Sequence, residues 1–389
     1  MDFDFTQEQV MLRNLAREVL SQECPTRVVR QMMDDPVGFS EPLWQKLAET
    51  GLLGITIDES RGGQALGMVD QALVLEEMGR AVYPGPYFAT VLLAASLIRA
   101  GGDRAQMDAY LPAIASGKLK ATLATSEDTR TATGGPEGTA LHARPLGGGY
   151  ALSGTKRFVP FAHVADLLLV GARTTDSSDR RRGITLFAIE RDTPGLKLTS
   201  NVSIDRTNKF STLTLEEVRV DRDAIVGRVD EGWEVLRPTL QRAAVGASAE
   251  MLGAARKCLE MSVEYARVRE QFGQPIGMFQ AVKHACAEML LEVENSHSAT
   301  YYAAWALDAD APDAGVAASV AKAYVSGAAR EVCGSAIQVH GGIGFTWEFD
   351  LHLYFKRAKH FEALYGDAEQ RRELVLREVL ASTAVPVLA

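Results

Sequence analysis

The chain has 389 residues, of which 47% are hydrophobic and 23% charged, a composition that excludes disordered, collagen-like and coiled-coil proteins. At roughly 100 to 200 residues per domain, this length predicts two or three domains. The formal net charge is -9, from 41 Lys and Arg against 50 Asp and Glu, which disfavours a nucleic-acid partner because phosphate binding normally needs a basic surface.

The first third of the chain has the spacing of helices joined by turns. Apolar residues recur at helical intervals over 10–20, and Thr6 followed by Gln9 has the form of a capping box. A later helix is expected to stop at Gly51. Residues 1–118 are therefore predicted to form an α-helical domain.

The middle of the chain changes to short apolar and β-branched runs separated by turn residues, among them YALSGTKRFV, DLLLVGAR and GITLFAIE. Runs of this length and spacing are typical of antiparallel strands. Residues 119–228 are predicted to form an antiparallel β-sandwich or barrel domain.

From residue 229 onward, long Ala-rich stretches return at 235–269, 280–308 and 313–340. Each is long enough to be a helix of a bundle. The predicted fold is α+β and multidomain, with a C-terminal four-helix bundle over 229–389.

Sequence features also bear on metals, membranes and location. The four cysteines lie far apart without zinc-ligand spacing, so neither a metal site nor a disulfide framework is expected. The acidic N-terminus is unlike a secretory signal, and no apolar run reaches the length of a membrane span. We expect a cytoplasmic protein without membrane segments.

The run YARVREQFGQPI at 265–276, followed by Phe-Gln at 279–280, resembles the Y-A-x-x-R-x-x-F-G signature of the acyl-CoA dehydrogenase family. The order of helical, β and helical segments is also similar to that family. The resemblance implies an FAD site in which Arg269 binds the diphosphate, since a guanidinium forms charge-assisted bonds with phosphates. It further implies that Phe272 packs on the cofactor, that Phe279 is also a cofactor-binding residue, and that Gln271 and Gln280 supply amides. Taken alone, Arg-x-x-Phe would equally suit an ordinary helix end.

A second run, AIQVHGGIGF at 336–345, resembles the family's Q-x-x-G-G-x-G-[FY] loop. Glycines there allow backbone N–H groups to approach a ligand closely. The resemblance implies that Gln338, Gly341 and Gly342 touch the adenosine half of an FAD held mainly by a neighbouring subunit, so the site requires an oligomer. Without the resemblance, the glycines would also suit a helix stop. The run does not follow a strand, which disfavours a Rossmann domain.

Two β segments resemble the family's flavin-facing strands. The run ATLATSE at 121–127 implies flavin and substrate contacts from Thr125 and Ser126. The run LSGTKRFVP at 152–160 places Phe158, Val159 and Pro160 where the family has Trp-Ile-Thr. Pro160 has neither an N–H nor a hydroxyl to donate to a flavin, whereas Phe158 can still offer an aromatic face.

The family's chemistry needs a carboxylate that removes the proton next to the thioester while a hydride leaves for the flavin. Alignment through KRAK at 356–359 and the following glycine puts Tyr365 where the family's commoner glutamate lies. A phenol is a poor base, because its pKa is about 10. The family's other position, near residues 241–244, holds no carboxylate.

Three carboxylates are alternative candidates for the catalytic base: Glu250, Glu362 and Asp367. Glu250 lies two helical turns beyond Ala243 and so on the same face, although it would also suit a polar helix residue paired with Arg256. Substrate contacts are predicted for Ser126, Arg242 and Tyr365.

Three functions follow as hypotheses. The first is FAD-dependent acyl-CoA dehydrogenation, in lipid or steroid side-chain β-oxidation, with electron-transfer flavoprotein as the acceptor and a homotetramer as the assembly. The second is a non-catalytic subunit that completes the FAD site of a heterotetramer with a paralogous chain. The LYGD turn and the GTKRFV segment resemble the bacterial steroid and bile-acid side-chain branch, which is built that way. The third is a flavin-free binding or scaffold protein of the same fold.

Overall fold

The computed structural model describes residues 4–127 and 135–382. It divides into two compact units. The bundle unit consists of Met1–Ser21, Ala72–Tyr83 and Ala244–Ala389, and the sheet unit consists of Gln22–Gln71 and Pro84–Ala243. Helices α4 (Met68–Ala81) and α7 (Gly232–Val268) contribute residues to both units.

The sheet unit begins with short helices whose ends are fixed by local bonds. They are α2 (Thr26–Asp34), α3 (Glu41–Glu49), the π-helical turn η3 (Phe88–Ala94), α5 (Ala95–Gly101) and α6 (Arg104–Ala115). The Ser40 side chain caps α3, and Asp103 forms a reciprocal capping box with Gln106 at α6. The chain leaves α3 through Gly51 at φ +77°, which confirms the predicted stop.

The middle segment forms an eight-stranded sheet in the described residues, in the order β6-β7-β3-β2-β4-β5-β8 with β1 beside β4. Its strands are β1 (Ala121–Ala124), β2 (His142–Leu146), β3 (Gly149–Pro160), β4 (Leu167–Arg173), β5 (Ile184–Glu190), β6 (Leu196–Asn201), β7 (Phe210–Val220) and β8 (Ile225–Val226). Most neighbours are antiparallel, as predicted, but β1 runs parallel to β4 over Ala121–Ala124. β2 also meets β4 in parallel, at His142 opposite Arg173. Leu152, Leu168, Phe187 and Leu213 are among the fully buried side chains of its core.

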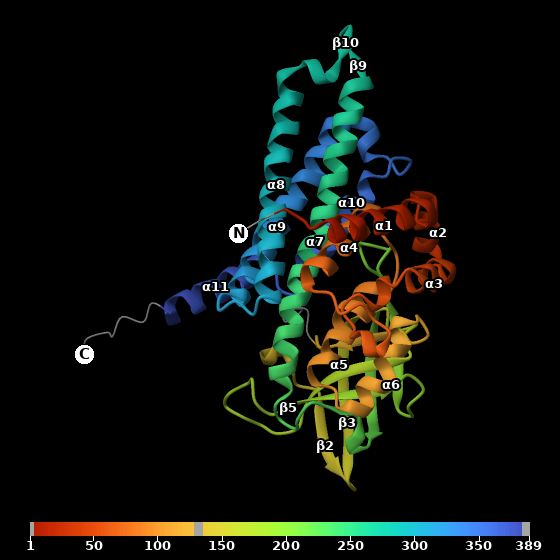
Figure 1. The fold of residues 1–389 in the computed structure, drawn as a ribbon, viewed down its shortest axis with the longest axis vertical. Helices are drawn as coiled ribbons and strands as arrows, with labels where there is room; N and C mark the ends of the chain where they lie inside the picture. The colour runs from red at the N-terminus through yellow and green to blue at the C-terminus, as the bar shows by residue number, and fades with distance from the viewer. Residues whose placement is uncertain (1–3, 128–134, 383–389) are drawn as a thin grey trace, which may run out of the picture. The chain divides into compact units, whose positions relative to one another are not determined.

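The bundle unit is built from long helices (Figure 1). They are α1 (Gln7–Glu23), part of α4 and of α7, α8 (Gln280–Asp308), α9 (Ala314–His340), α10 (Leu351–Ala363) and α11 (Ala368–Ser382). The predicted capping box at α1 is confirmed, since Thr6 and Gln9 exchange backbone-to-side-chain bonds of 3.1 and 3.2 Å. Small side chains let α9 pack closely, and Ala318, Ala321 and Cys333 are fully buried.

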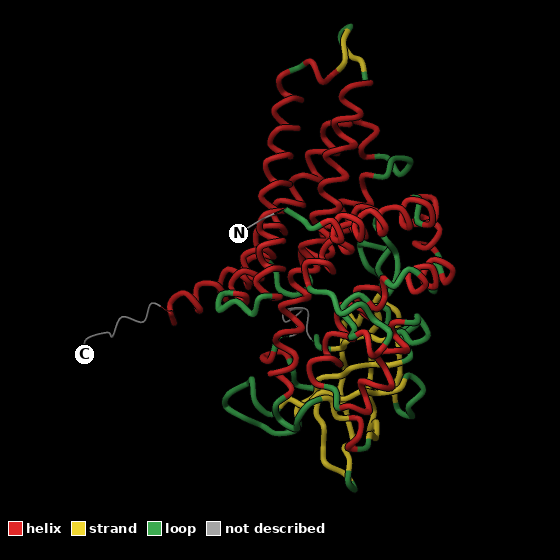
Figure 2. Tube along the Cα trace, viewed as in Figure 1, coloured by secondary structure: helices red, strands yellow, loops and turns green. Residues whose placement is uncertain are grey.

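The predicted fold class is confirmed: an N-terminal helical segment, a middle β segment and a C-terminal helical bundle follow one another along the chain. Apart from the hairpin of β9 (Glu270–Gln271) and β10 (Gln274–Pro275), the described strands gather within the sheet unit (Figure 2). Within the described ranges, none of the helices combines the length and apolar character needed to cross a bilayer.

Candidate functional site

The predicted cofactor-binding run begins in the last turns of α7 and continues into a β-hairpin of β9 (Glu270–Gln271) and β10 (Gln274–Pro275). Gln271 pairs with Gln274, so Phe272 and Gly273 form the turn, with φ of +54° and +77°. Positive φ at both central residues is typical of a type I′ turn, although a bulky residue there is unusual. The turn presents Phe272 to solvent with 91% of its surface exposed. Its ring lies edge-on to Phe279, with 6.0 Å between centroids.

Arg269 joins α7 to this hairpin and has an exposed side chain. Its backbone is fixed from both sides: its N–H donates to the Tyr265 carbonyl, and its carbonyl accepts from Ile276, each at 2.8 Å. Gln280, also exposed, is the first residue of α8. An exposed guanidinium on a fixed backbone suits a phosphate ligand.

The predicted glycine loop follows α9 directly and forms the 3₁₀ turn η8 (Gly341–Phe345). Gly341 has φ +61°, and a Cβ added at Gly341 or Gly342 would meet no atom within 4 Å. The backbone of this loop is therefore open on the side where side chains would stand. Gln338, in the last turn of α9, is exposed beside it.

A stack of aromatic rings joins these two motifs at one end of the bundle unit. The Tyr265 and His340 rings stack with centroids 4.4 Å apart and 22° between planes, and the Phe349 ring is tilted against His340 with 4.8 Å between centroids. His340 Nδ1 donates to the Ala336 carbonyl at 2.8 Å. Burial lowers the pKa of His340, which favours the neutral ring. The Arg269 hairpin and the Gly341 loop thus belong to one local structure.

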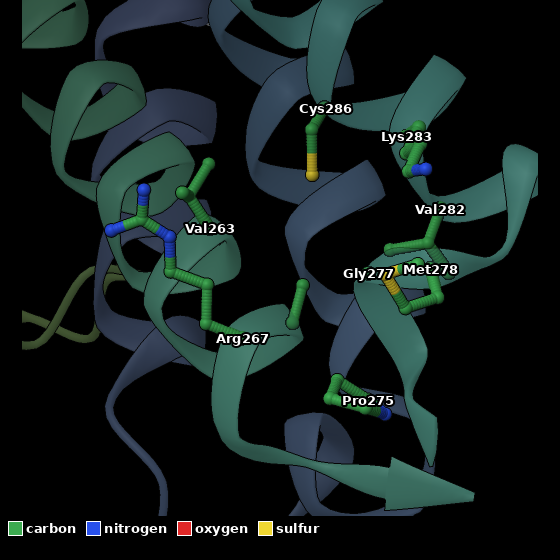
Figure 3. Close-up of a pocket in the computed structure, with 9 residues that line it drawn as sticks. Val263, Arg267, Pro275, Gly277, Met278, Val282, Lys283 and Cys286 are labelled. Carbon is green, nitrogen blue, oxygen red and sulfur yellow. The ribbon is translucent and has the colours of Figure 1, made fainter.

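A cavity of about 410 Å³ lies beside the hairpin, between α7 and the start of α8 (Figure 3). Val263 borders it from α7, whereas Met278 and Cys286 border it from the α8 side. Burial raises the pKa of the Cys286 thiol. None of the residues predicted to bind FAD lines this cavity.

In the sheet unit, the end of β1 lies against β3. Lys156 Nζ donates to the Thr125 carbonyl at 3.2 Å, and the Arg157 N–H donates to the Ser126 carbonyl at 2.7 Å. The β3–β7 register shifts between Lys156 and Val159, and Phe158 between them has φ +55°. Such bulges re-aim a side chain and are common beside active sites. The structure therefore brings predicted residues 125, 126 and 158 together.

The two residues after Phe158 are fixed by the same sheet. Val159 is buried, and the Pro160 carbonyl accepts a bond from Thr122 Oγ1 at 2.6 Å. Pro160 has no N–H to donate here, and Phe158, two residues earlier, supplies the aromatic side chain at this bulge.

Sequence reasoning missed the ion pair that fixes this edge. Glu127 accepts from Lys156 Nζ at 2.5 Å and from the backbone N–H groups of Ala140 and Leu141 at 2.9 to 3.0 Å. Burial lowers the pKa of Lys156 and the Glu127 charge opposes that shift. The partners lie 29 positions apart, and the alternation of strand β3 gives no hint that residue 156 is fully buried.

Glu250, a candidate base, lies inside the bundle unit and is only 4% exposed. Its Oε2 accepts from Arg357 Nη1 at 2.7 Å, and Arg357, which is fully buried, also donates to the Tyr83 carbonyl at 3.0 Å. The suggested pairing of Glu250 with Arg256 is wrong, because Arg256 instead bonds Glu76. The reason is that α10 supplies a closer cation to the buried face of α7.

Tyr365 follows α10, with φ +55°. Desolvation strongly raises the pKa of its phenol, and the charge of Glu250 raises it further. The charge of Glu250 on α7 therefore acts on the residue at the family's usual base position.

The other two candidate carboxylates have structural partners. Glu362 accepts from Arg330 and from Lys359, each at 2.6 Å. Asp367 caps α11, accepting from the Gln370 N–H at 2.9 Å. Of the three candidates, Glu250 is the one whose charge raises the pKa of Tyr365.

Arg242, predicted to bind substrate, belongs to the sheet unit and is half-buried. Its Nη1 lies 3.8 Å from Met68 Sδ. Among the residues described, no group of three or more His, Cys, Asp or Glu side chains is arranged to hold a metal ion.

Comparison with known proteins matches the chain in three consecutive segments. Residues 6–118 match the acyl-CoA dehydrogenase N-terminal domain, 121–218 the middle domain and 230–380 the C-terminal domain. The chain belongs to the acyl-CoA dehydrogenase family. FAD-dependent acyl-CoA dehydrogenation, predicted from the sequence, is the function that this membership supports.

Individual acyl-CoA dehydrogenases resemble it over their full length. A probable acyl-CoA dehydrogenase of Bacillus subtilis, YngJ, is 31% identical over 98% of this chain and 100% of its own. The Tcur3481-Tcur3483 steroid ACAD is 31% identical with a TM-score of 0.86, covering 97% of this chain and 99% of that one. The ChsE4-ChsE5 complex from Mycobacterium tuberculosis is 29% identical with a TM-score of 0.88, covering 99% and 100%.

Proposed function

We propose that this chain binds FAD and takes part in the α,β-dehydrogenation of an acyl-CoA thioester. The observation that carries the proposal is the Tyr265–His340 stack, which unites the exposed Arg269 hairpin and the open glycine loop. We expect cytoplasmic location and electron-transfer flavoprotein as the acceptor.

The residues present fit an FAD diphosphate and adenosine. The Arg269 guanidinium is accessible and can bind phosphate oxygens, and the backbone at Gly341 and Gly342 stands open to a ligand. Amides of Gln271, Gln280 and Gln338 are exposed around them. Because FAD in this family is held by two subunits, we infer that these groups serve the cofactor of a neighbouring subunit in a tetramer.

The flavin ring and the thioester are assigned to other residues. Phe158 offers an aromatic face at the β3 bulge, and Thr125 and Ser126 supply polar groups at the end of β1. When bound, FAD supplies the acceptor for the hydride that leaves the acyl chain. Arg242 and Tyr365 are proposed to contact the acyl-CoA.

For the proton, we assign Glu250 as the acceptor when the chain acts alone. Glu250 is buried, and its charge acts on Tyr365, which supports this choice. Of the other two candidates, Glu362 is paired with two cations and Asp367 caps α11. A buried carboxylate in a water-poor site is suited to proton transfer.

A second candidate function is favoured by the Glu250–Arg357 pair. Protonation of a carboxylate that is paired with a fully buried guanidinium neutralises the carboxylate and leaves the buried cation without its counter-charge, which is costly. We therefore keep the alternative that this chain completes the FAD site of a heterotetramer whose base lies on a paralogous chain. The names of the ChsE4-ChsE5 complex and the Tcur3481-Tcur3483 steroid ACAD support a two-chain assembly and a steroid acyl substrate.

One experiment tests both candidates. The chain is purified alone and with a co-expressed paralogue, and flavin absorbance and acyl-CoA oxidation are measured for the wild type and Glu250→Gln. Glu250 as the base predicts a loss of turnover of at least 100-fold with flavin content unchanged. A non-catalytic subunit predicts an inactive chain alone and a two-chain assembly that Glu250→Gln leaves active. No flavin in either preparation would overturn the proposal.

A further inference from the structure

Lys322 of α9 is a fully buried cation that the proposed function does not use. Its Nζ donates to the Gly366 carbonyl at 2.9 Å, to the Glu362 carbonyl at 3.2 Å and to Ser326 Oγ at 3.1 Å. An ammonium group has three donors, so these three acceptors use its full capacity. One acceptor, the Glu362 carbonyl, lies in the last turn of α10, and another, the Gly366 carbonyl, lies in the turn that follows this helix.

A second buried cation holds the same segment. Arg371 of α11 is 6% exposed, and its Nε donates to the Tyr365 carbonyl at 2.9 Å. Its Nη2 also bonds that carbonyl, and its Nη1 lies 3.5 Å from Ser319 Oγ on α9. The carbonyls of residues 362, 365 and 366 are thus bound by cations from two different helices.

The backbone that these cations hold has an unusual conformation. Tyr365 has φ +55° and Gly366 has φ +91°, so two successive residues occupy the left-handed region. A Cβ at Gly366 would lie 2.6 Å from Arg371 Nε. A non-glycine residue persists in this region only when its surroundings fix it, and the two cations provide that fixation.

The held segment carries the Tyr365 side chain, which lies within the electrostatic reach of Glu250. We propose that Lys322 and Arg371 are positioning residues that clamp the Tyr365–Gly366 turn, so that the proton on Lys322 controls where Tyr365 stands beside Glu250. The clamp follows from contacts within the bundle unit, whereas its effect on acyl-CoA rests on the proposed function.

The charge state of Lys322 gives the clamp a pH dependence. Desolvation and then the charge of Arg371 lower the pKa of Lys322 to about 7, against the opposing charges of Glu362 and Asp367. These groups face Lys322 from α11, from the last turn of α10 and from the turn itself. A neutral amine has two donors for three acceptors, so loss of the proton releases one bond of the clamp.

The test places a reporter on the turn itself. A 3-fluorotyrosine is incorporated at position 365 of the full chain, and its ¹⁹F resonance is followed from pH 6 to pH 9. We expect a shift with a midpoint near pH 7. A resonance that stays constant over this range would overturn the proposal.

Two variants of Lys322 assign the shift to its proton, and a variant of Lys359 provides a matched control. Lys322→Met has no amine and Lys322→Arg cannot lose its proton in this range, so either should abolish the shift. Lys359→Met removes a partly exposed lysine that bonds the Glu362 side chain, and it should keep the shift. Persistence of the shift in a folded Lys322 variant would contradict the clamp.

Activity is measured separately, on the same preparations. Lys322→Met, which removes all three donors, should lower the turnover of acyl-CoA at least tenfold between pH 6 and pH 9 while flavin content stays within twofold of the wild type. A titrating fluorine signal in a protein without flavin or activity would refute the proposed function and leave the clamp standing. Normal turnover in a folded Lys322→Met protein would refute the role of the clamp in the reaction.

Discussion

The bundle unit holds polar chemistry in two contrasting settings. At one end, Arg269, Gln338 and the glycine loop are exposed on a backbone that local bonds fix. In the interior, Arg357 and Lys322 are fully buried and bonded to carboxylate and carbonyl oxygens. The exposed groups are available to a ligand and contribute little to folding, whereas the buried ones must be paired for the chain to fold.

The largest expected effect is in the interior. Arg357→Met should lower the free energy of unfolding by about 3 to 5 kcal/mol, because it leaves Glu250 buried without its cation. Denaturant unfolding measures this loss. Glu250→Met combined with Arg357→Met should recover most of it, and Arg330→Met, at a partly exposed pair, should cost about 1 kcal/mol or less. Equal losses at Arg357 and Arg330 would remove the distinction between the two settings.

The second prediction concerns pH. Because the pKa of Lys322 is lowered to about 7 in the folded chain, the unfolded chain binds more protons between about pH 7 and pH 10.5. The contribution of Lys322 to stability should therefore rise with pH over this window, by at most about 1.4 kcal/mol per pH unit, and be constant below it. Unfolding midpoints of the wild type and Lys322→Met, compared at each pH, measure the difference. A difference that falls with rising pH would contradict this assignment.

The third prediction compares two glycines at positive φ. Gly366→Ala should destabilise the fold by about 1 to 3 kcal/mol, since its new Cβ meets the Arg371 side chain at 2.6 Å. Gly273→Ala, at φ +77° in the exposed hairpin, meets no atom within 4 Å and should cost only the backbone strain of about 1 kcal/mol. Thermal unfolding distinguishes them, and a larger loss at Gly273 would reverse the comparison.

The fourth prediction concerns Arg269, whose replacement should have the smallest effect on stability but a large effect on cofactor binding. Arg269→Met should change the free energy of unfolding by about 0.5 kcal/mol or less, because the side chain is exposed. The same change should reduce bound flavin at least tenfold, measured from the absorbance of the purified protein. Arg267→Met, two residues earlier and also exposed, is the control that should retain flavin. Unchanged flavin in Arg269→Met would separate the hairpin from cofactor binding.

The same contrast explains what the sequence could predict. Periodicity located the long helices over 235–269, 280–308 and 313–340 to within a few residues, because each buries a continuous apolar stripe. The runs at 265–280 and 336–345 were readable because their residues are close along the chain. Their meeting through Tyr265 and His340 was not, since it depends on how α7 packs with α9.

The buried ion pairs could not be read in this way. Glu250 and Arg357 are 107 positions apart, and Lys156 and Glu127 are 29 apart. A charged residue within a helical or strand pattern is normally expected to face solvent, so local spacing gave Glu250 the wrong partner. The parallel pairing of β1 with β4 was missed for a related reason, because short apolar runs reveal strands but not the direction of their neighbours.

The cavity beside the hairpin contains a cysteine that can be labelled selectively. Cys24, Cys258 and Cys333 are buried, whereas Cys286 is partly accessible and lines that cavity (Figure 3). A maleimide dye added to the native protein should therefore attach at Cys286 first, without mutagenesis. Fluorescence from such a label would report changes in the surroundings of the cavity between α7 and α8.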